Sequence, residues 1–89
     1  VLIVEDDVLT ATIISKIVEK ADLTPVVSHD GQEAYKMLAS DSNFAAAVFD
    51  IELPKIRGTD LLKFMRSEKS LYSIPVIMMT ASSEYVRFQ

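Results

Sequence analysis

The sequence has no cysteine and no long hydrophobic run, and each absence removes a class of protein. Without cysteine, neither disulfides nor thiolate metal sites can supplement the small core of this 89-residue chain. The longest wholly apolar stretch, Phe44 to Phe49, is far too short to span a bilayer. The apolar start, Val1 to Val4, lacks the basic flank and the cleavage site of a signal peptide. We therefore expect no membrane segment, and the lack of cysteine fits a reducing compartment.

Basic residues are the minority among the charged ones. Nine Lys and Arg residues stand against thirteen Asp and Glu residues, which gives a net charge of −4. Because affinity for nucleic acid depends on neutralised phosphates, this charge argues against direct contact with DNA or RNA. A generally acidic surface explains the charge, and so does a local carboxylate cluster that binds a cation.

Short apolar runs alternate with segments of helical periodicity, a pattern typical of a parallel α/β domain. The expected strands are Val1 to Val4, Pro25 to Val27, Ala45 to Phe49, and Ile74 to Met79. The expected helices run from about Val8 to Ala21, from Gln32 to Ser40 and from Thr59 to Glu68, and the last residues of the chain favour the start of another. Because crossovers between parallel strands are right-handed, helices should cover both faces of a doubly wound sheet.

The spacing of the apolar residues predicts which face of each helix is buried. In the first helix these residues are Leu9, Ile13, Ile17 and Ala21, with Ile14 and Val18 beside them. In the second helix Ala34, Tyr35, Met37 and Leu38 lie on or beside the inner face, and the third helix buries Leu61, Leu62 and Met65.

Polar residues follow three of the expected strands at the point where each strand ends. Glu5, Asp6 and Asp7 follow the first strand, Asp50 follows the third and Thr80 follows the fourth. In a parallel sheet these ends share one edge, and ligands of open α/β sheets bind beyond it. Carboxylates crowded at that edge repel one another unless a cation neutralises them. Ligand sets made only of oxygen favour a hard ion, and Mg²⁺ is the expected one.

Each of these residues also has a simpler interpretation. Asp7 suits the N-cap of the first helix, and we prefer that role for it. Glu5 or Asp6 alone would fit a solvated loop as well as a ligand, and a lone Asp50 would suit a turn. Thr80 alone suits a strand or a helix cap. The convergence of all of them on one sheet edge is what favours a binding site.

Taken together, the motifs resemble the receiver family of bacterial-type response regulators. The matching segments are Val4 to Asp7, His29 to Ala34, Phe49 to Pro54, Gly58, and Met79 to Ala81. The separations of Asp6, Asp50 and Thr80 along the chain also fit the family. The resemblance covers essentially the whole chain, and it implies a flavodoxin-like sheet with strand order 2-1-3-4, which a fifth strand extends in the family.

The resemblance implies a magnesium site with defined ligands. Asp6 and Asp50 would bind Mg²⁺ directly, together with the backbone carbonyl of Glu52. Glu5 would act through a bound water. Magnesium suits this arrangement because it binds through few carboxylates, keeps several waters and recruits phosphate oxygens.

The resemblance also implies a phosphoryl-accepting switch in the cytoplasm. Asp50 would take a phosphoryl group from a phosphohistidine on a histidine kinase or a histidine phosphotransfer protein. Thr80 would donate its hydroxyl to a phosphoryl oxygen, and the small side chain of Ala81 would leave that group accessible. A carboxylate nucleophile makes a labile acyl phosphate. The chain would therefore be a signalling switch and not an enzyme, with slow autodephosphorylation only.

The chain departs from the family pattern at Arg57 and at both ends. The family more often has an acidic or polar residue at the position of Arg57. Receivers continue beyond the position of Gln89 to a fifth strand, whose terminal lysine contacts the phosphoryl group, and Val1 begins inside the first strand. We therefore expect residues 1–89 to be part of a longer receiver domain. Dimerisation through the fourth-strand side stays open.

Two alternative functions stay open as well. The missing lysine is compatible with a degenerate receiver that acts only as a protein-binding module. A phosphohydrolase with an aspartate nucleophile also places an aspartate and magnesium at a strand end, with a second acid two residues on, where Glu52 stands. Such an enzyme does not require Glu5 and Asp6 on an earlier strand.

Overall fold

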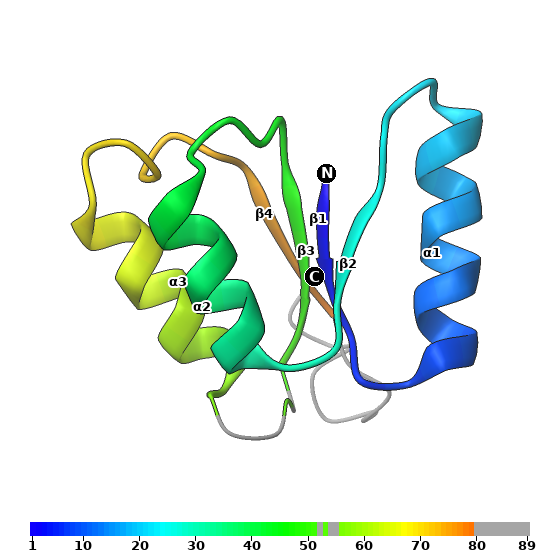
Figure 1. Cartoon of the computed structure of the whole chain (residues 1–89), viewed down its shortest axis with the longest axis horizontal. Helices are drawn as coiled ribbons and strands as arrows, with labels where there is room; N and C mark the ends of the chain where they lie inside the picture. Colours follow the sequence, from blue (N-terminus) through cyan, green and yellow to red (C-terminus); the bar gives the residue numbers. More distant parts are fainter. Residues whose placement is uncertain (52, 54–55, 80–89) are drawn as a thin grey trace.

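A parallel sheet lies between two layers of helices in the computed structural model, which describes residues 1–51, 53 and 56–79 (Figure 1). The strands are β1 (Leu2–Val4), β2 (Val26–Ser28), β3 (Ala47–Asp50) and β4 (Val76–Met79). Every neighbouring pair is parallel, and the order is β2-β1-β3-β4. The predicted doubly wound, flavodoxin-like α/β fold and its strand order are confirmed.

The register of the strands brings their carboxyl ends to one level. Val4 of β1 pairs with Phe49 of β3, so that Glu5, the next residue, lies at the level of Asp50. Asp50 in turn pairs with Met79 of β4. The residues that follow β1 and the last residue of β3 are therefore neighbours at the same sheet edge.

One helix covers one face of the sheet, and two helices cover the other (Figure 1). The first face has α1 (Val8–Lys20), and the second has α2 (Gly31–Ser40) and α3 (Gly58–Ser67). Asp7 is the N-cap of α1 as predicted, since its side chain accepts a hydrogen bond from the Thr10 backbone N–H at 3.0 Å. None of the helices in the described part of the chain combines the length and the apolar character that a membrane span requires.

The main core fills the space between the sheet and the helices α2 and α3. It contains the predicted inner-face residues Ala34, Leu38, Leu61 and Met65, which pack with buried strand residues such as Phe49. Tyr35, which was predicted on or beside the inner face of α2, lies beside it and is exposed. The Tyr35 ring lies 4.5 Å from that of Phe64, measured between centroids, so that it covers the outer side of the α2–α3 contact.

The predicted buried stripe of α1 was wrong. Leu9, Ile13 and Ile17 are 69%, 52% and 61% exposed, and Ala21 is exposed too. Val18, which was predicted beside that stripe, is buried, and so is Ala11, which was not predicted. Both sets recur at helical spacing, so periodicity alone does not choose between them. The helix contacts β1 and β2 through the face that carries the smaller side chains.

Candidate functional site

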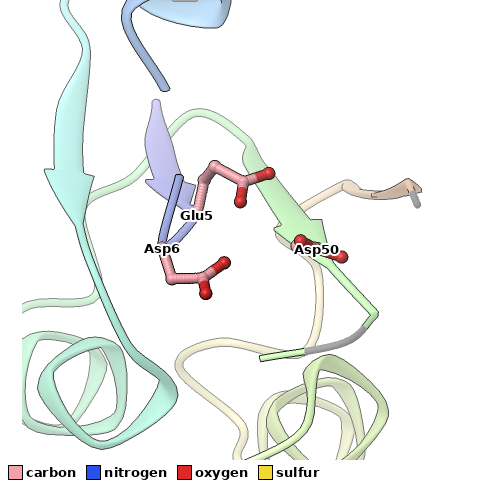
Figure 2. Close-up of side chains that lie close together, drawn as sticks. All are labelled: Glu5, Asp6 and Asp50. Atoms are coloured by element: carbon pink, nitrogen blue, oxygen red, sulfur yellow. The ribbon is translucent and has the colours of Figure 1, made fainter. Parts of the chain in front are cut away.

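Three acidic side chains meet beyond the carboxyl ends of β1 and β3. Glu5 and Asp6 follow β1, and Asp50 ends β3. One carboxylate oxygen from each of the three lies within 4.8 Å of the others. In Figure 2 the carboxyl groups of Glu5 and Asp6 extend toward the side on which Asp50 lies. The structure thus brings together three of the residues that the sequence proposes for the site.

The three residues differ in their access to solvent. Glu5 is only 4% exposed, Asp50 is partly buried and Asp6 is exposed. One oxygen of Glu5, Oε2, accepts a hydrogen bond from the Asp7 backbone N–H at 3.0 Å. Glu5 therefore helps to hold the turn that leads into α1. Asp6 is the member of the cluster that is in contact with solvent.

Burial of Glu5 dominates the electrostatics of the cluster. Desolvation raises the pKa of Glu5 to about 7, and the hydrogen bond from the Asp7 backbone N–H opposes this increase. The negative charge of Asp50 raises the pKa further, as do side-chain hydrogen bonds with Asp6 and Asp50. Full ionisation of all three carboxyl groups is therefore unfavourable unless positive charge is added between them.

This donor set fits a hard divalent cation. All three groups are carboxylates, and hard ions such as Mg²⁺ and Ca²⁺ prefer oxygen ligands. Mg²⁺ commonly uses one or two carboxylates and keeps several waters, and the exposed Asp6 leaves the cluster accessible to water. A bound cation would also offset the charge of Asp50, which adds to the desolvation that raises the pKa of Glu5.

Close packing at the start of α3 fixes the backbone of Asp50. A Cβ atom on Gly58 would lie 2.4 Å from the carbonyl oxygen of Asp50, so only glycine allows this approach. The Gly58 backbone N–H also donates to the carbonyl of Ile51, with an N···O distance of 3.3 Å. From the sequence alone, Gly58 was noted only as part of the family pattern, with no packing role assigned to it. The signal that was missed is a glycine at the first position of a helix, where propensity does not favour it.

Three predicted site residues, Glu52, Thr80 and Ala81, lie outside the described residues. Pro54 of the matching motif does as well.

The whole chain, residues 1–89, matches the family described as response regulator receiver domain. The chain belongs to this receiver family. The match agrees with the observed strand order and with acidic residues at the ends of β1 and β3.

Proteins from plants and bacteria are similar to this receiver. The two-component response regulator ORR3 of Oryza sativa subsp. indica is 28% identical over the whole chain, which covers 68% of that protein. The transcriptional regulatory protein CpxR of Escherichia coli K12 is 32% identical over 91% of the chain, which corresponds to 33% of its own length. The crystal structure of the response regulator TrrA from Thermotoga maritima, in complex with Mg²⁺-BeF, aligns with a TM-score of 0.83 and 26% identity. That alignment covers 94% of this receiver and 70% of TrrA.

Proposed function

We propose that residues 1–89 are receiver-domain sequence of a cytoplasmic phosphorelay switch in which Asp50 accepts a phosphoryl group. The donor would be a phosphohistidine on a histidine kinase or a histidine phosphotransfer protein. The observation that carries this proposal is the position of Asp50 at a strand end, facing Glu5 and Asp6 from the neighbouring strand. Family membership supports the reaction class.

Asp6 and Asp50 would hold Mg²⁺, and Glu5 would act through a bound water. When bound, the ion would neutralise the charge on the transferring phosphoryl oxygens. The TrrA structure, which is described as a complex with Mg²⁺-BeF, supports a magnesium site in this fold. We assign the backbone carbonyl of Glu52 to the same ion on the basis of the family motif.

The chemistry needs little covalent help from the protein. One carboxylate oxygen of Asp50 would attack phosphorus as the bond from phosphorus to the histidine nitrogen breaks, and the imidazole would leave. The acyl phosphate is labile and would be lost slowly by hydrolysis. The remaining requirement is in-line positioning, which the fixed backbone of Asp50 favours.

Thr80 and Ala81 would contact the phosphoryl group. Thr80 directly follows Met79 in the chain, and Met79 pairs with Asp50 in the sheet, which supports the assignment of its hydroxyl to a phosphoryl oxygen. The small side chain of Ala81 would leave access to that group. Movement of Thr80 after phosphorylation would pass the signal on.

Mass spectrometry after incubation with acetyl phosphate and Mg²⁺ tests the proposal. The wild-type protein should gain one phosphoryl group, and Asp50→Asn should gain none. Asp22→Asn is a matched control because it removes the same charge from an exposed residue after α1, and asparagine tolerates the positive φ of 65° there. A wild-type protein that gains no phosphoryl group would favour a degenerate protein-binding module. Sustained hydrolysis of a phosphomonoester would favour a phosphohydrolase.

A further inference from the structure

The turn between β2 and α2 contacts both segments that carry the acidic cluster. On one side, the backbone N–H of Glu5 donates to the carbonyl of Ser28 at 3.0 Å. Ser28 is fully buried, and its hydroxyl donates to the carbonyl of Asp30 at 2.8 Å. On the other side, Gly31, the first residue of α2, lies against the backbone of Ile56, which follows β3 in the chain. This turn therefore connects the end of β1 with the segment that leads from Asp50 to α3.

Position 31 needs glycine because there is no room for a side chain, and not because the backbone adopts a conformation that favours glycine. No glycine in the described residues has a positive φ, and Asp30 caps α2 by accepting a hydrogen bond from the Glu33 backbone N–H at 2.7 Å. Glycine is also a poor helix former, so helix propensity does not explain its presence. A Cβ atom on Gly31 would lie 2.2 Å from the carbonyl oxygen of Ile56 and 2.8 Å from its Cβ. Because the obstructing atom belongs to the backbone, any side chain would force Ile56 away from α2.

A displacement of Ile56 would reach Asp50 through Gly58, which follows Ile56 by two residues and packs on the backbone of Asp50. Leu53 is buried in the main core, and Ile56 packs against that core. Beyond Ile56, Gly58 contacts the carbonyl oxygen of Asp50 and bonds to Ile51. Ile56 is therefore held between the main core and the contact of Gly58 with Asp50.

We propose that Gly31 is a positioning residue of the acidic site. By having no side chain, it lets Ile56 lie against the start of α2, and this contact holds Asp50 opposite Glu5 and Asp6. Ser28 supports the same turn from the side of β1. The inference rests on the proposed function of the cluster as a site for Mg²⁺ and a phosphoryl group.

Titration of the protein with Mg²⁺ alone, followed by NMR or calorimetry, tests this role. Gly31→Ala should raise the Mg²⁺ dissociation constant by about tenfold or more, as is common when an outer partner of a metal site is changed. The rate of phosphorylation by acetyl phosphate should fall as well. Val18→Ala is the control, since it removes buried methyl groups from α1, on the opposite face of the sheet. It should lower the melting temperature and leave the Mg²⁺ dissociation constant unchanged.

Ser28→Ala keeps the test decisive if Gly31→Ala does not fold. It removes the hydrogen bond to the Asp30 carbonyl without adding volume, and it should weaken Mg²⁺ binding in the same direction but less. If Gly31→Ala folds and keeps the wild-type Mg²⁺ affinity and phosphorylation rate, the role of Gly31 is overturned, while the proposed function still stands. If only Ser28→Ala folds, the same result in that variant has the same meaning. If the wild-type protein does not bind Mg²⁺, or if Asp50→Asn leaves its Mg²⁺ binding unchanged, both the proposed function and the role of Gly31 are overturned.

Discussion

Without a divalent cation, the protein should lose stability as the pH rises toward neutrality, because Glu5 resists ionisation. The pKa of Glu5 is about 7 in the folded protein, against an ordinary value of 4.5. Below pH 4.5 the carboxyl group is protonated in both states, and its contribution to stability is fully present. Between pH 4.5 and about 7 the unfolded chain ionises while the folded protein keeps this proton, so the contribution declines and is lost once the pH has risen through about 7. At about 1.4 kcal/mol for each pKa unit, the loss amounts to about 3 kcal/mol.

Glu5→Gln isolates this effect from the titration of other groups. Glutamine stays neutral and keeps an oxygen that can accept the hydrogen bond from the Asp7 backbone N–H. In EDTA, urea unfolding from about pH 5 to about pH 8.5 should show a free energy of unfolding that falls for the wild type relative to Glu5→Gln. Saturating Mg²⁺ should make the fall in the wild-type free energy of unfolding smaller, since a cation offsets the charge of ionised Glu5.

Glu19→Gln is the matched control, because Glu19 is an exposed residue of α1. Its pH dependence should follow the wild type. The reasoning is refuted if the wild type and Glu5→Gln show the same pH dependence in EDTA, or if Glu5→Gln is the less stable of the two above pH 7.

Three further predictions concern the parts of the fold that hold the site. Asp7→Ala should lower the free energy of unfolding in urea by about 1 kcal/mol, because α1 loses its N-cap, and no change would show that the cap is dispensable. Gly58→Ala should cost about 1–3 kcal/mol in the same assay and also slow phosphorylation by acetyl phosphate, because the new methyl group collides with the Asp50 carbonyl. Ile13→Gln should change the free energy of unfolding by no more than about 0.5 kcal/mol, as expected for an exposed position. A loss of several kcal/mol would instead support burial of the stripe that the periodicity predicted.

The arrangement of the sheet and the meeting of the acidic residues were predictable from the sequence. Alternating short apolar runs and helical segments indicate parallel strands, and parallel strands put their carboxyl ends at one edge. The resemblance to the receiver family implied the strand order that makes β1 and β3 neighbours. Glu5, Asp6 and Asp50 each lie within two residues of such an end. Their proximity therefore follows from the topology, before any side-chain packing is known.

The buried face of α1 was not predictable in the same way. The helix has two groups of apolar residues at the same spacing. Which group is buried depends on which side of the helix packs on the sheet. The large side chains Leu9, Ile13 and Ile17 form the more hydrophobic stripe, but the helix packs on the strands through Val18, at the edge of that stripe, and through Ala11. The roles of Gly31 and Gly58 also depend on contacts with distant backbone, which the order of residues does not reveal.

The central claim is that the carboxyl groups of Glu5, Asp6 and Asp50 form one divalent-cation site beside the phosphoryl acceptor. A crystal structure of the protein with Mn²⁺ tests it most directly, because anomalous scattering locates the ion without assumptions about its ligands. We expect one ion in contact with carboxylate oxygens of both Asp6 and Asp50. An ion bound elsewhere, with Asp6 and Asp50 too far apart to share one, would contradict the account.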